Sequence, residues 1–379
     1  MRSLKEVNVF TDGDSSQIST WSNVPFFLTE TLLAKGIKVN RIDISPSRKL
    51  SRIFYSTFYR VLTRINKKTS YTYLRSLLHF LDTRNKIAAA IKKHPFADAD
   101  IFITFSFSST GLTNKPIIQF CDWTYSYDLA HFSNIMAPDI FERQAVKRED
   151  SQIMGADLIF PLFPSIAEYM KARYSNKNIF YLGNVINSLY KVSPDEINIK
   201  NNSNSLLFVG SKKYIAGAKA LIEAFESLKH TYPKLALDII GMQTSDFEIL
   251  PVGVSCHGYL DKGNDTEREL YYKIFRNARI FINTTPKWGA FSASIEAMYF
   301  YTPVIVTPYN EFLKTFGQNI DFGYYCEENN ATLIKSKILD ILQHESYQQL
   351  CINANNAVKD FTWDAYVDKM VEKIEEITK

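Results

Sequence analysis

The sequence predicts an α/β protein built from two doubly wound parallel sheets. Short strand-like runs alternate with helix-like runs along the chain, a pattern typical of parallel α/β architecture. The alternation lapses between Asn184 and Ser205, where the Asn-rich run Asn198–Asn204 predicts a polar linker. Length agrees with this division, because 379 residues suffice for two domains. Two such sheets are expected to border a cleft, with ligands at the carboxyl ends of the strands.

The first half opens with a strand whose end is marked by a polar turn, and it continues with helices and further strands in alternation. Strands are expected at Val7–Thr11, Lys38–Ile44, Ile101–Phe105, Ile117–Cys121, Asp157–Pro161 and Ile179–Leu182. Helices are expected at Phe26–Lys35, over most of 50–93, at Glu142–Met154 and at Ser165–Arg173. Gly36 ends the first of these helices, as glycine often does just past a helix.

The second half repeats the pattern after the linker. Strands are expected at Leu206–Val209, Leu235–Ile240, Val254–His257, Arg279–Ile282 and Val304–Val306. Helices are expected at Ala218–His230, Glu267–Asn277, Ser294–Phe300 and Asp364–Ile377, the last with apolar residues at helical spacing. The two domains are therefore predicted to comprise residues 1–187, completed by the C-terminal helix 362–379, and residues 188–361.

Composition narrows the class of protein. Hydrophobic residues make up 46% and charged residues 22%, which excludes large-scale disorder. The sequence has no apolar run near the roughly 18–20 residues of a membrane span and no secretory signal at its start, so we expect a cytoplasmic protein. Its four cysteines are too far apart to predict a zinc site or a disulfide framework. The net charge of +4 is too small to indicate nucleic acid, and no nucleic acid partner is expected.

A basic and aromatic stretch, residues 47–93, stands out from this ordinary composition. It holds twelve Lys and Arg against one acid, Asp82, and Tyr and Phe are interleaved among the cations. Such a composition suits a surface helix that attaches to anionic lipid headgroups. The alternative interpretation is a solvated face whose aromatic side chains enter the core.

Four stretches of the second half stand out in their order and spacing, namely LLFVGSKKYIAGAKALIEAFESL (206–228), LALDIIGM (235–242), VSCHGYLDK (254–262) and NARIFINTTPKWGAFSASIEAMYFYTPVIVT (277–307). Together they resemble glycosyltransferase family 4, the glycosyl transferases group 1, which are enzymes of the GT-B fold. The preceding stretch, GADLIFPLFPSIAEYMKARYSNKNIFYLGNVI (155–186), looks like the end of that family's N-terminal domain. Residues 1–150 resemble it by architecture alone.

The resemblance implies two Rossmann-like domains that face each other, an N-terminal one for the acceptor and a C-terminal one for the donor. It implies transfer of a sugar from a nucleotide-sugar donor to a glycan or lipid-linked acceptor, usually with retention at the anomeric carbon. Cofactors and metals are not expected, because protein groups stabilise the leaving diphosphate. The composition is compatible with a bacterial surface-polysaccharide pathway, and the expected location is the cytoplasm, peripheral on the inner face of the membrane.

Glu296 is the first candidate for donor binding. It follows a segment whose backbone N–H groups are expected to lie open at a helix N-terminus, an arrangement suited to a diphosphate. By family position, Glu296 would accept hydrogen bonds from the ribose hydroxyls, although a glutamate there also stabilises the helix dipole. The donor-binding segment before it comprises Gly289, Ala290, Phe291 and Ser292.

The sequence departs from the family at two places. Trp288 occupies the position of a second glutamate that touches the donor sugar, and it offers an indole N–H and a flat face instead. Ser211 and Ala216 occupy the positions of an Arg and a Lys that bind phosphate. Lys212 or Lys213, in the same loop, is assigned that catalytic role as a point charge, with a solvated loop as the alternative.

Other donor-binding candidates follow predicted strands. Gly210 ends the first strand of the second domain, and Gly241 ends the next one. Tyr259, in the loop His257-Gly258-Tyr259-Leu260, is placed to stack on the nucleobase. In each case a turn with a packed aromatic is an equally good interpretation.

Polar residues after two strands of the first domain are candidates for the acceptor side. Asp12, Gly13 and Asp14 follow the first strand, and Trp21 lies on the same crossing loop. Asp122 follows another strand, and His131 comes soon after it. Either group near the cleft would orient or deprotonate the acceptor hydroxyl, with Asp122 ranked first. An N-cap aspartate and a surface histidine are the alternatives.

Two other classes of function stay open. The departures at 211, 216 and 288 favour a scaffold of the same fold that binds nucleotide or glycan without catalysis. The same fold also supports sugar-nucleotide epimerisation. The sequence contains neither GxxxxGK(S/T) nor GxGxxG, which argues against nucleoside triphosphatases and dehydrogenases. It also lacks a Ser/His/Asp nucleophile elbow.

Overall fold

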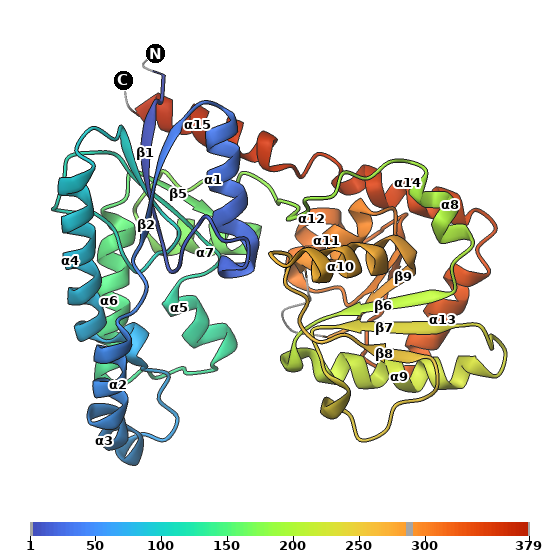
Figure 1. Ribbon diagram of the computed structural model, residues 1–379. Coiled ribbons are helices and arrows are strands. Elements are labelled where there is room, and N and C mark those ends of the chain that lie inside the picture. The colour runs from blue at the N-terminus through green and yellow to red at the C-terminus, as the bar shows by residue number, and fades with distance from the viewer. Residues whose placement is uncertain (1–2, 286–290, 378–379) are drawn as a thin grey trace. The chain divides into compact units, whose positions relative to one another are not determined.

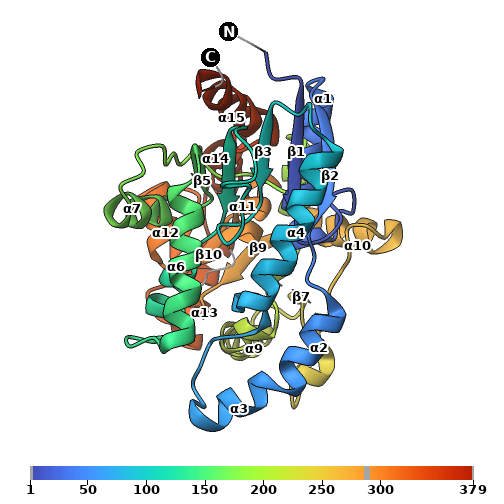
Figure 2. The same ribbon diagram turned by 90° about the vertical axis from the view of Figure 1, so that its left-hand side faces the viewer.

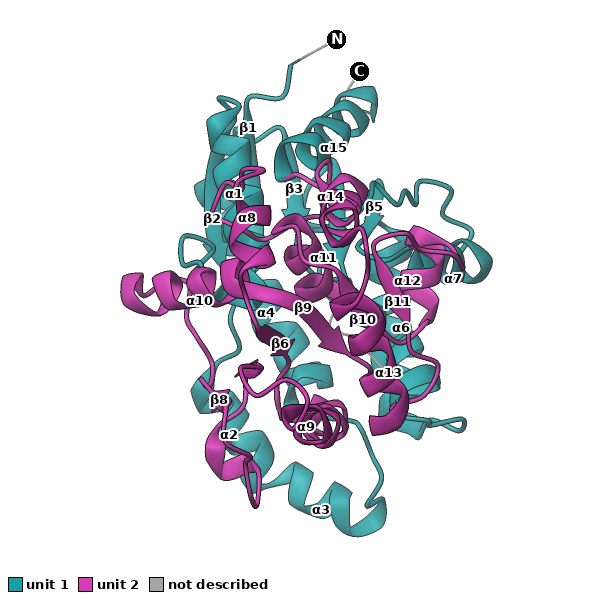
Figure 3. Ribbon diagram, turned by 90° about the vertical axis from the view of Figure 1, so that its right-hand side faces the viewer, with its two compact units in different colours: residues 1–184, 363–379 teal, residues 185–362 magenta. Residues whose placement is uncertain are grey.

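The computed structural model describes residues 3–285 and 291–377. The chain divides into two compact units, of which unit 1 is Met1–Asn184 with Trp363–Lys379 and unit 2 is Val185–Thr362 (Figures 1 and 3). The boundary after residue 184 lies three residues before the predicted one, and the C-terminal helix belongs to unit 1. Each unit is built around its own parallel sheet.

Unit 1 has a five-stranded sheet in the order β2-β1-β3-β4-β5, with every pair parallel. The strands are β1 (Glu6–Thr11), β2 (Lys38–Asp43), β3 (Ala99–Phe102), β4 (Ile117–Cys121) and β5 (Leu158–Pro161). Strands β3 and β5 are buried throughout, which explains why they read as continuous apolar runs. This order reverses direction between β1 and β3, and ligands bind beyond the carboxyl ends of strands at such a point.

Helices cover both faces of this sheet. They are α1 (Val24–Ala34), α2 (Arg48–Ser56), α3 (Phe58–Ile65), α4 (Leu77–Lys93), the one-turn α5 (Tyr125–Tyr127), α6 (Ile140–Met154), α7 (Pro164–Arg173) and α15 (Trp363–Ile377). Phe10 and Phe102 stack at 4.4 Å between ring centroids in a core that includes Ile87 of α4 and Ile153 of α6. Trp363 of α15 stacks on Phe27 of α1, which ties the C-terminal helix to unit 1.

Two predicted strands of unit 1 differ from the observed ones by more than one terminal residue. Ile179–Leu182 is not a strand, because Ile179 forms a single bridge with Ile159 and no ladder follows. The predicted Ile101–Phe105 is shifted, since β3 ends at Phe102 and the chain leaves the sheet there. The polar residues that follow Phe102 are consequently placed at the sheet edge, where they line a cavity described below.

Some aromatic residues of the stretch 47–93 enter a core, and others are exposed. Phe54 and Tyr73 are buried in a small core with Tyr125 of α5. Tyr55 and Phe58 are exposed, as are the apolar residues Ile53, Val61 and Ile65. Figures 1 and 2 show α2 and α3 at the end of unit 1 opposite to the chain termini. No helix in the described part of the chain has both the length and the apolar character needed to cross a bilayer.

Unit 2 has a six-stranded parallel sheet in the order β11-β10-β9-β6-β7-β8. The strands are β6 (Ser205–Val209), β7 (Ala236–Ile240), β8 (Val254–Cys256), β9 (Ala278–Asn283), β10 (Val304–Val306) and β11 (Gly323–Tyr325). Counted from β6, this is the order 3-2-1-4-5-6 of dinucleotide-binding domains, and its direction reverses between β6 and β9.

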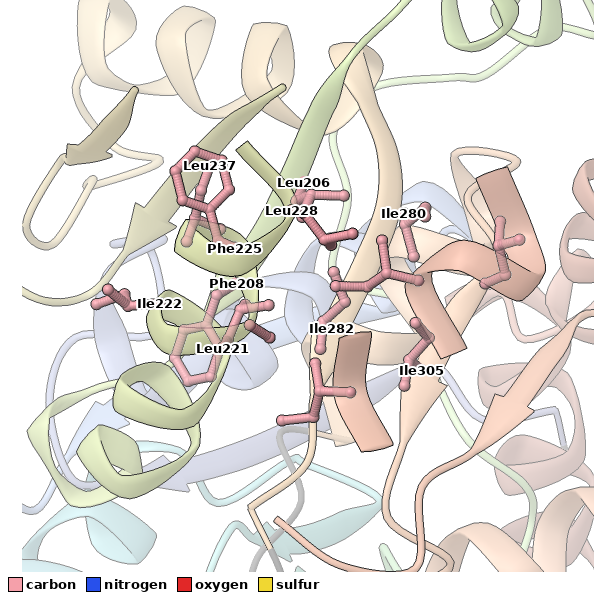
Figure 4. Packing of buried hydrophobic residues seen from close by; sticks show 14 of the residues in the cluster. Leu206, Phe208, Leu221, Ile222, Phe225, Leu228, Leu237, Ile280, Ile282 and Ile305 are labelled. Atoms are coloured by element: carbon pink, nitrogen blue, oxygen red, sulfur yellow. The ribbon is translucent and has the colours of Figure 1, made fainter. Parts of the chain in front are cut away.

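The helices of unit 2 enclose this sheet. They are α8 (Glu196–Asn201), α9 (Ile215–Lys229), α10 (Asp265–Asn277), α11 (Phe291–Tyr299), α12 (Asn310–Phe316), α13 (Ala331–Leu342) and α14 (Tyr347–Val358). Figure 4 shows the core, in which Phe208 and Ile282 of the sheet pack with Leu221 and Phe225 of α9. Strand β11 and helices α12 to α14 lie outside the elements predicted from the sequence.

The predicted polar linker is partly wrong, because it contains helix α8. Glu196 is buried and accepts a hydrogen bond from Arg276 Nε at 3.0 Å. Lys200 is fully buried, and its ammonium donates to the carbonyls of Phe275 and Ala278 at 2.9 and 3.0 Å. Burial lowers the pKa of Lys200 to about 7. These partners are supplied by α10 and β9, so a segment that is polar in sequence becomes part of a packed unit.

Candidate functional site

A cavity of about 450 Å³ opens in unit 1 at the point where its strand order reverses. Thr11 and Asp12 line it at the end of β1, and Ile103 and Thr104 line it at the end of β3. Asp122 lines it at the end of β4. Parallel strands bring their carboxyl ends to one sheet edge, so residues far apart in the chain meet there. The structure thereby brings together three predicted residues, Asp12, Trp21 and Asp122, in the lining of one pocket.

Asp122 directly follows β4 and is held by its own neighbours. Its Oδ1 accepts hydrogen bonds from the Trp123 backbone N–H at 2.8 Å and from Cys121 Sγ at 3.2 Å. Burial raises the pKa of Asp122, which makes this carboxyl a better proton acceptor than an exposed aspartate. The alternative role as an N-cap is filled by Thr124, whose side chain accepts from the Tyr127 N–H.

A buried polar cluster that the sequence did not indicate forms another wall of this cavity. Glu149 of α6 accepts hydrogen bonds from Ser106 Oγ at 2.8 Å and from the backbone N–H of Tyr125. Arg75 reaches Glu149 at 3.4 Å and lies over the Tyr125 ring at 4.2 Å. Burial raises the pKa of Glu149 in spite of this cation.

The remaining acceptor-side candidates are close to the cavity without lining it. The Gly13 N–H donates to Asp43 Oδ1 at 3.1 Å, and Asp14 accepts from the Ser16 N–H at 2.8 Å. His131 is exposed and packs on Tyr127, with 4.1 Å between ring centroids. It is not among the residues that line the cavity. Their roles in acceptor binding and catalysis stay predictions.

His79 of α4 also lines the cavity, and burial lowers its pKa to about 4. The ordinary pKa of histidine is about 6.5, so between these two values the unfolded chain binds the extra proton and the folded chain does not. Stability from His79 is therefore complete above pH 6.5 and is lost as pH falls towards 4. We expect His79→Gln to reduce the loss of unfolding free energy between pH 7 and 4 by about 3 kcal/mol.

Urea unfolding at both pH values measures this difference. The matched control is His230→Gln, because His230 is exposed on the surface of unit 2 and is expected to leave the pH profile unchanged. Parallel profiles for the wild type and His79→Gln would show that His79 is protonated in the folded protein.

The carboxyl ends of β6 and β9 meet at the reversal point of unit 2. Asn283 of β9 donates from Nδ2 to the carbonyl of Val209 at 3.2 Å, and its Oδ1 accepts from the Thr285 N–H. The predicted donor residue Gly241 has φ +95°, and its N–H donates to the Gly258 carbonyl at 2.6 Å. An added Cβ at Gly241 would lie 2.6 Å from the carbonyl oxygen of Gly210. Loops after three strands are thus in direct contact around the predicted donor position.

The two candidate lysines follow Gly210 and the exposed Ser211 in this loop region. Lys212 forms an ion pair with Asp246 at 2.8 Å, although three-quarters of its side chain is exposed. Lys213 Nζ lies over the Tyr214 ring at 4.9 Å. An exposed pair of this kind contributes little to stability, so Lys212 can leave Asp246 for a ligand anion at small cost.

Glu296 lies in α11 and is the centre of a buried cluster. Lys262 Nζ donates to both carboxylate oxygens, at 2.7 and 3.0 Å, and to the Asn187 carbonyl at 2.7 Å. The Tyr271 hydroxyl donates to Glu296 Oε2 at 2.8 Å. Glu296 is 5% exposed and Lys262 6%. Three of these hydrogen bonds end on the Glu296 carboxylate, and Oε1 accepts one of them. Oε1 therefore keeps a lone pair for a further donor such as a hydroxyl.

The other donor candidates have varied surroundings. Phe291 begins α11 and is buried against Tyr309 and Phe312, while Ser292 is exposed. Tyr259 is 69% exposed, which fits a stacking surface better than a packed aromatic. Trp288, Gly289 and Ala290 lie outside the described residues.

Sequence reasoning missed the partners of both carboxylate clusters. Lys262 is the last residue of the quoted stretch VSCHGYLDK, yet its distance of 34 residues from Glu296 gives no local signal of pairing. Arg75 and Glu149 are 74 residues apart and read as surface charges of two helices. The described residues contain no group of three or more His, Cys, Asp or Glu placed to hold a metal ion.

Residues 191–358 match the family model described as Glycosyl transferases group 1. A crystal structure of a glycosyltransferase from Rickettsia africae ESF-5 is 15% identical, with a TM-score of 0.66 and coverage of 99% of both chains. Sucrose-phosphate synthase from Thermosynechococcus elongatus is 15% identical, with a TM-score of 0.67 and coverage of 98% of this chain and 99% of that one. Anabaena HepE in complex with UDP-glucose is 12% identical, with a TM-score of 0.62 and the same coverage. Comparison with curated proteins gives no match.

At these identities the solved structures show the fold, and the family match adds the class of enzyme. Both sheets are parallel and Rossmann-like, as that fold requires. The match spans unit 2 from residue 191, shortly before α8, to the end of α14. The protein is therefore a glycosyltransferase of the GT-B fold whose residues 191–358 form a glycosyl transferases group 1 domain.

Proposed function

We propose that the protein transfers a sugar from a nucleotide-sugar donor held by unit 2 to a hydroxyl of a glycan or lipid-linked acceptor held by unit 1. The observation that carries this proposal is the group 1 match of residues 191–358. The loops of Gly210, Gly241 and Gly258, which follow β6, β7 and β8, contact one another at the carboxyl edge of the sheet in this region. HepE, which shares the fold, is described in complex with UDP-glucose, and this supports a nucleotide-sugar donor.

In this proposal each group of unit 2 has one task. The N-terminus of α11 and the cation of Lys212 or Lys213 stabilise the diphosphate as it leaves, because helix N–H groups and ammonium groups attract anions. Glu296 accepts hydrogen bonds from the ribose hydroxyls, and Lys262 and Tyr271 hold its carboxylate in place. Tyr259 stacks on the base. Neither a metal nor an organic cofactor takes part, and the sugar is transferred with retention.

In unit 1 the cavity at the end of β4 receives the acceptor. Asp122 is the group that we propose to orient the acceptor hydroxyl and to take up its proton, with the raised pKa as support. Trp21 and Asp12 contact the sugar from the β1 side. The pathway that we propose is synthesis of a bacterial surface polysaccharide.

Turnover of the full chain with a panel of nucleotide sugars, in buffer that contains EDTA, tests this function. The informative variant is Lys262→Met/Glu296→Gln, because it removes the carboxylate and its counter-charge together and leaves no buried unpaired charge. Charge-assisted hydrogen bonds contribute about 1.5–3 kcal/mol each, so we expect transfer to fall about 10- to 100-fold.

The matched control is the partly exposed ion pair of α13, replaced as Lys337→Met/Asp340→Asn, which is expected to leave turnover unchanged. Absence of both sugar transfer and nucleotide-induced thermal stabilisation would contradict the proposal. Nucleotide binding without turnover would favour the catalytically silent scaffold, and a changed nucleotide sugar without acceptor would favour epimerisation.

We also propose that α2 and α3 bind the inner face of the membrane. Five exposed apolar residues lie on these two helices beside the cations Arg48, Lys49, Arg52, Arg60 and Arg64. Each basic residue near an anionic surface contributes about 1 kcal/mol to attachment. We expect Arg60→Glu/Arg64→Glu to weaken co-sedimentation with phosphatidylglycerol vesicles at least tenfold.

The control for this experiment is Lys234→Glu/Lys359→Glu, which reverses two exposed charges of unit 2. It has the same net charge as the test variant. Equal loss of vesicle binding in both variants would show that attachment depends on net charge alone and not on α2 and α3.

A further inference from the structure

The lining of the unit 1 cavity carries an excess of negative charge. Its described side chains include four carboxylates, those of Asp12, Asp122, Asp128 and Glu149, and one guanidinium, that of Arg75. His79 contributes no charge near neutral pH, because its pKa is lowered to about 4. Carboxylates therefore outnumber cations four to one around a space large enough for a sugar ring.

The single guanidinium of this lining already has partners. Arg75 Nη1 donates to Ser106 Oγ at 3.0 Å and lies 3.4 Å from Glu149 Oε1. Its planar group also covers the Tyr125 ring. Glu149 thus compensates the charge of Arg75, and an incoming anion would have to compete with a buried carboxylate for it.

The other three carboxylates have few donors of their own. Asp12 accepts from the Ser45 side chain, Asp128 Oδ2 accepts from Ser133 Oγ at 3.3 Å, and Asp122 accepts at its Oδ1. Ionised carboxylates are acceptors only, and each offers about four lone-pair sites. Hydroxyl and ammonium groups supply the donors that such a wall lacks, whereas a carboxylate or phosphate adds a like charge.

Aromatic side chains form the rest of a wall suited to a sugar. Trp21, Trp123, Tyr125 and Phe107 line the same cavity. Flat apolar faces that are combined with a few oriented polar groups are the common composition of ligand sites. A pyranose ring matches both parts, because its C–H face is apolar and its edge carries hydroxyls.

We infer that the unit 1 cavity selects acceptors whose terminal sugar carries no negative charge, either a neutral sugar or an amino sugar, and excludes those that end in a uronic acid or a phosphorylated sugar. That the bound sugar is an acceptor rests on the proposed function, whereas the selection by charge depends on the cavity alone. The inference specifies a class of acceptor, which the fold by itself does not determine.

Ligand-observed NMR of the full chain without any donor tests this selection. The probes are the p-nitrophenyl glycosides of glucose, of 2-amino-2-deoxyglucose and of glucuronic acid, which share a ring and differ in charge. We expect the glucuronide to bind at least tenfold more weakly than the glucoside. Equal or tighter binding of the glucuronide overturns the inference, and so does the absence of binding by both uncharged and amino glycosides.

The variant Asp12→Asn/Asp128→Asn locates the effect, because it removes two charges without removing a buried paired group. It is expected to reduce the glucoside-to-glucuronide affinity ratio at least threefold, whereas Asp321→Asn/Asp340→Asn, two exposed residues of unit 2, leaves the ratio unchanged. An unchanged ratio in the cavity variant overturns the inference. Nucleotide binding is measured separately by thermal shift, so a failed donor site and a failed charge selection give different results.

Discussion

Lys262→Met is expected to lower the free energy of unfolding by about 3–5 kcal/mol. The substitution keeps the apolar length of the side chain but leaves the Glu296 carboxylate buried with the Tyr271 hydroxyl as its remaining donor among the bonds described above. A buried charge without a counter-charge costs far more than the pair itself contributes. The Asn187 carbonyl loses its donor in the same variant.

Urea unfolding of three variants isolates this cost. The double variant Lys262→Met/Glu296→Gln is expected to be much less destabilised than the single one, because neither charge is then left alone. Lys337→Met, which breaks a partly exposed pair of α13, is expected to change stability by no more than about 1 kcal/mol. A single variant as stable as this control would mean that the Lys262 ammonium gives the Glu296 carboxylate no net stabilisation.

Gly241→Ala is expected to remove nucleotide binding and to destabilise unit 2. Two costs add at this position. A non-glycine residue at a positive φ costs about 1–2 kcal/mol, and the new Cβ would meet the Gly210 carbonyl oxygen at 2.6 Å. Because that contact is with backbone, the loops after β6 and β7 have to separate, and both border the proposed donor position.

Gly36→Ala is the matched control, since Gly36 has a φ of +79° and open space around its Cβ position. It carries the backbone cost without the clash. Thermal unfolding with and without UDP compares the two variants, and we expect stabilisation by UDP to persist in Gly36→Ala and to vanish in Gly241→Ala. Persistence in both would place the nucleotide away from these loops.

Local patterns in the sequence predicted most strands of the two sheets. Buried parallel strands such as β4 and β10 are short apolar runs between polar turns, so their bounds were predicted correctly. Helix α13 was not predicted, although Ile334, Ile338 and Ile341 stand at helical spacing and are all buried. The signal for α13 was therefore present in the sequence.

Predictions failed where a residue's partner is distant in the chain. Lys200 reads as part of a polar linker, yet carbonyls of α10 and β9 satisfy its ammonium in the interior. Ile179 reads as the start of a strand, yet it reaches β5 through one bridge alone. Neither outcome follows from the residues beside it, because burial and pairing depend on which surface the segment meets.

The sequence by itself determined the alternation of strands and helices, the similarity of its second half to a transferase family, and several residues at the ends of strands. The tertiary structure decided which of these residues share a site. Asp12, Trp21 and Asp122 line one cavity because parallel strands end at a common edge, and Arg75, from the turn before α4, and Glu149 of α6 complete its wall. Glu296 likewise has its ionic partner through folding alone, since an ion pair between residues 34 positions apart depends on distance in space.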